Sequence, residues 1–297
     1  MTISLAWVRR NKATVELIVA SDSRLRSRGP LDQAQKIFPL ERGDCCLAFC
    51  GDTQITYPLF MQVGSTINNF IKTKTRAEDV TKVAHLISQL LDQLVSSWDL
   101  PTADKYAELC HTKIIFGGWS WQNKRFDIGV FEYGSSGFKY VHPKMKLPHP
   151  WGETHRSLMF IGDYEAEYMA SLVQILERRK AAVLEDERTG KRLVDFDFEP
   201  LEALNLLLQE ARSGRFPAVG GAPQVAKVYS YGNSLPIVIR LSKQQHFLFG
   251  RKLFEWEKTE YPVLDLTESP LLMRYPKEQI PLPGELNSPS KDLLSTS

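Results

Sequence analysis

Thr2 is the residue whose type and position most directly suggest chemistry in this sequence. Aminopeptidases generally remove an initiator methionine that precedes a small residue, and Thr2 would then carry a free α-amine. Such an amine has a pKa of about 7.7–8.0, so at neutral pH a useful fraction can accept the proton of the hydroxyl on its own residue. The alternative interpretation is that Thr2 is only a small polar residue tolerated after the initiator.

Asp22 and Lys36 are the charged residues that could support this nucleophile. Asp22 directly follows a predicted strand, and Lys36 directly precedes another. If the strand order brings both beside Thr2, the ammonium group favours the unprotonated amine and a developing alkoxide, while the carboxylate holds the lysine. Each residue also has a purely structural interpretation, Asp22 as a turn cap and Lys36 as a solvated charge at a sheet edge.

Gly51 lies where a predicted strand passes into a predicted helix. Such a junction exposes backbone N–H groups at the N-terminus of the helix, and the N–H of Gly51 could stabilise an oxyanion. A tight turn with Asp52 as the N-cap is the structural interpretation, and the two are compatible.

Alternating blocks of strands and helices must position these residues. Period-two apolar runs predict strands at 3–8, 13–20, 37–38, 45–49, 113–116, 126–133, 138–141, 157–161, 224–231, 235–241 and 246–254. Helical spacing of apolar residues predicts helices over 55–71, 80–95, 169–176 and 201–211. Because strands and helices come in blocks, the sequence predicts an α+β fold in which two stacked antiparallel sheets lie between two layers of helices.

The distribution of charged residues and prolines along the chain indicates the domain organisation. One domain is expected over 2–257, with a charged, solvated insertion near 183–198. Residues 258–297 are rich in proline and end in a polar stretch, which predicts a tail.

Composition argues against several classes of function. The chain has 37 Lys+Arg and 35 Asp+Glu, and its net charge of +2 offers no electrostatic basis for binding nucleic acid or a membrane surface. No apolar run approaches the roughly 20 residues that span a bilayer, and the start does not resemble a signal peptide, so the expected location is cytoplasmic. The four cysteines and six histidines lack the spacing of metal ligands, so neither a metal nor a cofactor is expected.

Five short segments together resemble the proteasome β-subunit family of N-terminal nucleophile hydrolases. They are Thr2-Ile3-Ser4, Ala20-Ser21-Asp22-Ser23-Arg24, Lys36-Ile37-Phe38, Phe49-Cys50-Gly51-Asp52 and Phe160-Ile161-Gly162-Asp163. Bacterial proteasome-related peptidases of the Anbu type are the most similar group, since they also begin Met-Thr without a long propeptide. The order of strands and helices is similar from residue 2 to about residue 255, and 219–226 resembles the family's approach to its last strands.

This resemblance implies a four-layer αββα sandwich with Thr2 at the mouth of the cleft between the sheets. It implies that Thr2 is the nucleophile, Asp22 the catalytic aspartate, Lys36 the catalytic lysine and Gly51 the oxyanion glycine, while Asp163 resembles the acidic residue of the Anbu type. The implied substrate is a peptide or an unfolded protein, and no cofactor is implied. Self-assembly into a homo-oligomeric ring or a related assembly is implied too, with an unfoldase or regulator as a partner.

Three hypotheses about function remain open at this point. The leading one is a threonine-type endopeptidase. The second is a small-amide hydrolase on the same fold, because a fold does not determine its substrate. The third is a catalytically silent, proteasome-like structural subunit, favoured by Asp163 standing where many relatives have serine and by the lack of a match for the family's second aspartate.

Overall fold

The computed structural model describes residues 2–11, 14–26, 29–99, 102–154, 157–185, 190, 192–257 and 259–275. In this part of the chain it has six helices and three β-sheets, a mixed α/β arrangement. Neighbouring strands are antiparallel, apart from one parallel pair. None of the described helices has both the length and the apolar character needed to cross a membrane.

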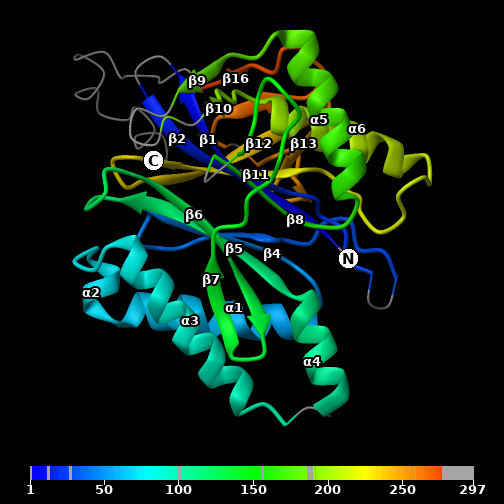
Figure 1. The fold of residues 1–297 in the computed structure, drawn as a ribbon. Helices are drawn as coiled ribbons and strands as arrows, with labels where there is room; N and C mark the ends of the chain where they lie inside the picture. The colour runs from blue at the N-terminus through cyan, green and yellow to red at the C-terminus, as the bar shows by residue number, and fades with distance from the viewer. Residues whose placement is uncertain are drawn as a thin grey trace, which may run out of the picture.

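The larger sheet has nine strands, and the first strand of the chain lies inside it (Figure 1). From one edge its strands are β8 (Leu158–Gly162), β1 (Ile3–Asn11), β2 (Thr14–Ser21) and β11 (Gln224–Tyr229). The sheet continues with β12 (Ser234–Ser242), β13 (Gln245–Leu248) and β14 (Arg251–Lys252), while β15 (Val263–Asp265) pairs with β12 and β16 (Met273–Arg274) pairs with β15. The predicted hairpin of the first two strands is confirmed. Because β1 pairs with β2 on one side and β8 on the other, its start lies between the ends of those two strands.

The smaller sheet has five strands in the order β3-β4-β5-β6-β7. They are β3 (Ile37–Pro39), β4 (Cys45–Cys50), β5 (Lys113–Ser120), β6 (Arg125–Gly134) and β7 (Gly137–Val141). All five were expected from their apolar patterns. This sheet carries residues 36 and 51 at the ends of β3 and β4.

Four of the six helices agree with the apolar spacing of the sequence. They are α1 (Thr53–Asn69), α3 (Val80–Ser96), α5 (Glu165–Arg179) and α6 (Glu199–Arg212). The first expected helix ends at Asn69, and the short α2 (Ile71–Lys74) follows after Phe70, whereas α4 (Thr102–His111) was not predicted. Leu109 is the one aliphatic side chain larger than alanine in α4, so apolar periodicity gives no signal there.

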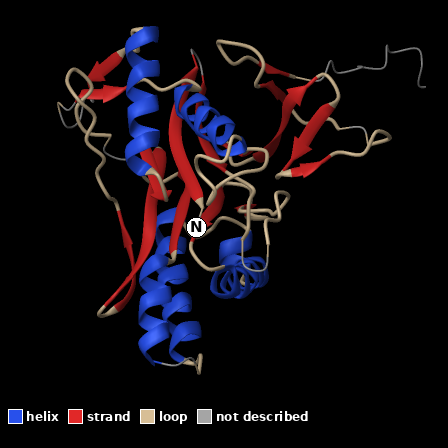
Figure 2. Cartoon of the chain, turned by 90° about the vertical axis from the view of Figure 1, so that its right-hand side faces the viewer, coloured by secondary structure: helices blue, strands red, loops and turns tan. Residues whose placement is uncertain are grey.

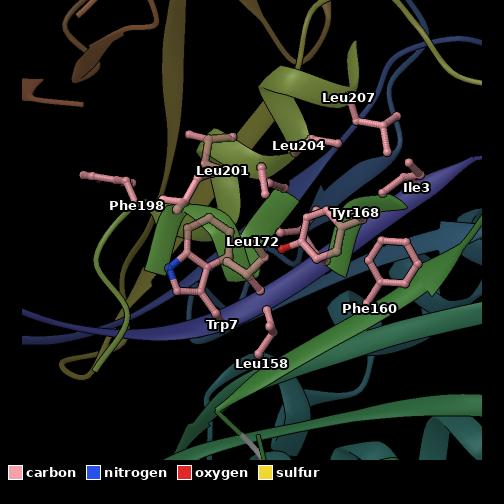
Figure 3. Packing of buried hydrophobic residues seen from close by; sticks show 14 of the residues in the cluster. Ile3, Trp7, Leu158, Phe160, Tyr168, Leu172, Phe198, Leu201, Leu204 and Leu207 are labelled. Atoms are coloured by element: carbon pink, nitrogen blue, oxygen red, sulfur yellow. The ribbon is translucent and has the colours of Figure 1, made fainter. Parts of the chain in front are cut away.

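Three hydrophobic clusters show how the sheets and helices pack. One lies between the larger sheet and helices α5 and α6, and includes Trp7 and Leu204 (Figure 3). Another lies between the smaller sheet and helices α1 and α3, and includes Ile87. The third joins the two sheets and includes Ile115. Each sheet therefore buries both of its faces.

Alternation along β1 places Thr2 on the face between the sheets. Leu5 belongs to the cluster on the helix side, whereas Ala6 belongs to the cluster between the sheets. Thr2 and Ser4 share the face of Ala6, because successive side chains of a strand point to opposite faces. The Ser4 hydroxyl accordingly donates to the Phe49 carbonyl of the smaller sheet at 2.8 Å. In Figure 2 the start of the chain lies at the middle of the molecule, with helices above and below it.

Peripheral segments differ from the sequence-based expectation. The expected solvated insertion contains a hairpin of β9 (Val183–Glu185) and β10 (Arg192–Val194), and Phe196 bridges to Arg9 of β1. The strand expected over 246–254 is instead the pair β13 and β14, because Gly250 at φ +80° turns the chain. Residues 263–265 and 273–274 of the expected tail form β15 and β16, and 276–297 lie outside the described residues.

Candidate active site

The hydroxyl and the backbone nitrogen of Thr2 are each bonded to a charged side chain. Lys36 Nζ donates to Thr2 Oγ1 at 2.9 Å, and the backbone nitrogen of Thr2 donates to Asp163 Oδ2 at 2.8 Å. Thr2 is almost completely buried, with 1% of its surface exposed. Removal of residue 1 would turn the bonded nitrogen into an amine beside the hydroxyl.

Lys36 and Asp22 form a fully buried ion pair next to Thr2. Lys36 Nζ lies 2.8 Å from Asp22 Oδ1, and neither side chain has any exposed surface. Burial lowers the pKa of Lys36 below its ordinary value, and the Asp22 carboxylate offsets part of that effect. A lysine with a lowered pKa can stabilise an alkoxide when protonated and accept the threonine proton when neutral.

Backbone N–H groups hold the Asp22 carboxylate in place. Oδ1 accepts from the N–H of Ile3 at 3.1 Å, and Oδ2 accepts from the N–H groups of Arg24 and Gly220, each at 3.1 Å. The contact with Arg24 is the turn cap that the structural interpretation expects. The contacts with Ile3 and Gly220 go further, because they join three distant segments at one buried carboxylate.

Gly162 and Asp163 enclose Thr2 from the end of β8. Gly162 has φ +117°, and a Cβ atom there would lie 1.8 Å from the carbonyl oxygen of Thr2. Only glycine therefore allows β8 to approach so closely. The N–H of Asp163 donates to the same carbonyl at 3.1 Å, while its carboxylate accepts from the nitrogen of Thr2. These two bonds fix the backbone of Thr2 on both sides.

Gly51 follows β4 directly and precedes helix α1. Its φ is +113°, and an added Cβ would lie 2.7 Å from Thr112 Cα, so the turn requires glycine. Asp52 is the N-cap of α1 and its side chain accepts from Gln54 N, as expected from the sequence. The backbone of Gly51 therefore lies at the helix N-terminus, where N–H groups can bind negative charge.

A cavity of about 710 Å³ opens beside Thr2. Thr2, Gly51 and Asp163 all line it, so the structure brings these three predicted residues to one space. Lys36 and Asp22 do not line the cavity; Lys36 bonds to the Thr2 hydroxyl, and Asp22 bonds to Lys36. All five predicted residues thus belong to one connected region.

Helix α4 and Gln224 also belong to this region, and neither was predicted from the sequence. Helix α4 contributes Glu108, Cys110 and His111 to the cavity wall, and its sequence offered helix formers but no apolar stripe. Gln224, at the start of β11, bonds to the segments that carry Asp22 and Lys36. The segment 219–226 resembles a segment of the family, but a single glutamine at the start of a strand does not indicate a functional role.

The thiol of Cys50, next to Gly51, has the environment of a structural residue. Cys50 is buried beside Gly51, and burial raises its pKa to about 11. Such a thiol is a poor nucleophile at neutral pH, because the thiolate is the reactive form. Among the described residues, no group of three or more His, Cys, Asp or Glu side chains is arranged to hold a metal ion.

Comparisons with known proteins give structural likenesses and no match to a family model or a curated protein. Among solved structures, the chain is similar to the Anbu (Gly-1) mutant from Hyphomicrobium sp. strain MC1, with 13% identity and a TM-score of 0.49. The alignment covers 84% of this chain and 87% of that one. The chemistry of the site must therefore be argued from the residues of this chain.

Proposed function

We propose that this protein is a threonine-type N-terminal nucleophile hydrolase that cleaves peptide bonds, built as a four-layer αββα sandwich like the subunits of proteasome-related peptidases. One observation carries the proposal: Lys36 Nζ lies 2.9 Å from Thr2 Oγ1 and 2.8 Å from Asp22 Oδ1, and the Lys36 and Asp22 side chains are fully buried. A hydroxyl held by a buried lysine beside its own backbone nitrogen is the arrangement that an N-terminal nucleophile requires.

The first half of the reaction forms an ester. Once residue 1 is removed, the α-amine of Thr2 accepts the hydroxyl proton while Oγ1 attacks the carbonyl carbon of the substrate. Lys36 stabilises the developing negative charge on Oγ1, and the N–H of Gly51 stabilises the oxyanion of the tetrahedral intermediate. The C–N bond then breaks, and the leaving amine takes the proton from the α-ammonium group.

The second half of the reaction releases the acyl group. Water attacks the ester carbonyl and transfers a proton to the α-amine, and the same oxyanion position stabilises the second intermediate. The ester C–O bond breaks, and Oγ1 recovers a proton. Asp163 accepts from the nitrogen of Thr2 and so holds the amine beside the hydroxyl through both halves.

The size of the cavity favours peptides over small amides as substrates. Its volume of about 710 Å³ lies well inside the range of pockets that enclose drug-sized ligands. A ligand of that size corresponds to a peptide of several residues. Residues of helix α4 and of the start of α5, which are far from Thr2 in the sequence, also line the cavity. Self-association and an unfoldase or regulator partner belong to the same proposal and are tested by light scattering and by pull-down with purified candidates.

The proposal is tested by hydrolysis of a fluorogenic peptide panel alongside small amides. We expect peptide cleavage by the wild type and none by Thr2→Ala, with Thr75→Ala as the matched control because Thr75 is exposed and does not line the cavity. Turnover of small amides without peptide cleavage would support the amidase. Equal inactivity of the wild type and Thr2→Ala, in protein whose N-terminus is Thr2, would support the silent subunit and refute the proposal.

A further inference from the structure

Gln224 is a buried amide whose whole hydrogen-bonding capacity is directed at the region around Lys36. It has no exposed surface, and alternation along β11 places it on the face between the sheets, together with Ala226. Its Nε2 donates to the carbonyls of Ala34 at 2.6 Å and Asp22 at 3.0 Å. Its Oε1 accepts from the N–H of Lys36 at 2.9 Å. Both N–H donors and the carbonyl of this amide are therefore used.

These bonds join the two sheets at the point where the ion pair crosses between them. Asp22 follows β2 of the larger sheet, whereas Lys36 precedes β3 of the smaller one. The connection over 23–35 is long, and its described residues, 23–26 and 29–35, contain no strand of the two sheets. The distance between the carboxylate and the ammonium group therefore depends on what holds the two ends of the connection together. Gln224 bonds to both ends.

Ser23 gives the same connection a second anchor. The Ser23 hydroxyl donates to the carbonyl of Ala222 at 2.6 Å, and the N–H of Ser23 donates to the carbonyl of Gly220 at 3.0 Å. These bonds hold the end at Asp22, and the N–H of Ala34 donates to the Ser23 carbonyl at 3.0 Å, so one backbone bond also joins the two ends directly. Of the side chains whose contacts are described, Gln224 is the one that bonds to the backbone of Lys36.

We propose that Gln224 is a positioning residue that holds Lys36 at bonding distance from Thr2 and Asp22, so that the rate of the acyl transfer depends on its amide. This inference rests on the proposed function for its kinetic consequence, but its structural part is independent of any activity. Displacement of a catalytic group by about 1 Å costs up to roughly 100-fold in rate. Binding of substrate in the cavity needs no contact with Gln224, which does not line it.

The kinetic test uses Gln224→Met, which keeps the length of the side chain and removes all three bonds. We expect kcat to fall by about 10- to 100-fold with little change in KM. Gln209→Met on the exposed face of α6 is the matched control and should keep the wild-type kcat. A wild-type kcat in folded Gln224→Met would overturn the proposal.

The structural test measures the pKa of Lys36 by NMR in protein with ¹³C-labelled lysine, the Lys36 signal being assigned with Lys36→Arg. The groups whose charge acts on Lys36 are Asp22 after β2, Asp163 after β8, Cys50 in β4 and Asp32 in the preceding connection, and Thr2 bonds to its amine. Gln224→Met removes the bond to the Lys36 backbone, so we expect the ammonium group to move away from the Asp22 carboxylate and the pKa of Lys36 to fall further below its ordinary value. This measurement needs no catalysis.

The two tests separate failure of this inference from failure of the proposed function. An inactive wild type in which Gln224→Met lowers the pKa of Lys36 would refute the peptidase and leave the positioning role intact. An active wild type with an unchanged Lys36 pKa in Gln224→Met would overturn the positioning role alone. If neither Gln224→Met nor Gln224→Leu folds, the residue serves the fold as a whole, and the proposal is also overturned.

Discussion

Replacing Lys36 with methionine tests whether the buried ion pair serves stability, chemistry or both. Methionine has nearly the length of lysine and no charge, so it fills the space of a side chain that has no exposed surface. The substitution removes the donor to Thr2 Oγ1 and the cation facing Asp22. The Asp22 carboxylate is then left buried without a cation.

The structure sets the size of the expected loss. Removing one partner of a buried ion pair destabilises a protein by about 3–5 kcal/mol, because the remaining charge is uncompensated. Asp22 keeps its bonds to the backbone N–H groups of Ile3, Arg24 and Gly220, so we expect the low end, about 3 kcal/mol. The double variant Asp22→Asn/Lys36→Met no longer buries a lone charge and should recover most of this loss. Both variants should lose activity by at least about 100-fold.

Urea unfolding followed by tryptophan fluorescence gives the stabilities, and peptide hydrolysis gives the rates. Asp22→Asn alone completes the cycle and supplies the coupling between the two residues. Wild-type stability of Lys36→Met would show that the pair is not buried as described. Activity in the double variant would show that neither residue takes part in the chemistry.

Three further predictions concern neighbouring groups. The folded-state pKa of Lys36 lies below its ordinary value of 10.5, so the folded state binds fewer protons between these two values. The stability of the wild type relative to Lys36→Met should therefore rise with pH through that window, as urea titrations at several pH values measure. Gly162→Ala should lose more than about 2 kcal/mol of stability and all activity, since its Cβ meets the Thr2 carbonyl, whereas Gly64→Ala in open space should not be destabilised. Cys50, with its pKa raised to about 11, should react with iodoacetamide far more slowly than the less buried Cys110, as peptide mapping at pH 8 measures.

A specific result would contradict each of these predictions. A relative stability that falls with pH would mean that the pKa of Lys36 is raised by folding. Wild-type activity of Gly162→Ala would mean that β8 does not confine Thr2. Alkylation of Cys50 as fast as in the unfolded chain would mean that its thiol is exposed or activated.

Local patterns were enough to predict the elements that carry the site. The β1–β2 hairpin follows from two apolar runs around a polar turn, and α1 follows from its apolar spacing and the Asp52 cap. Alternation then decides that Thr2 shares a face with Ser4. That Thr2, Asp22 and Lys36 meet was expected from a family resemblance, and their distances agree with it. Their roles in a reaction remain predictions.

Long-range contacts could not be predicted from local patterns, because such patterns carry no information about residues far apart in the chain. Gln224 bonds to Lys36 across 188 positions, and no local propensity reports such a contact. The pairing of β1 with β8, which brings Asp163 to Thr2, is equally non-local. Helix α4 lacks an apolar stripe, and the two or three residues of β14, β15 and β16 are too few for a pattern to emerge.

The central claim is that Thr2 is an N-terminal nucleophile, and mass spectrometry of the intact protein after treatment with a threonine-directed epoxyketone tests it most directly. We expect a protein without Met1 that gains the full mass of one reagent molecule, located on the peptide that begins with Thr2. Thr2→Ala should gain none. Protein that retains Met1 throughout and gains no reagent would contradict the account, since no amine would then stand beside the Thr2 hydroxyl.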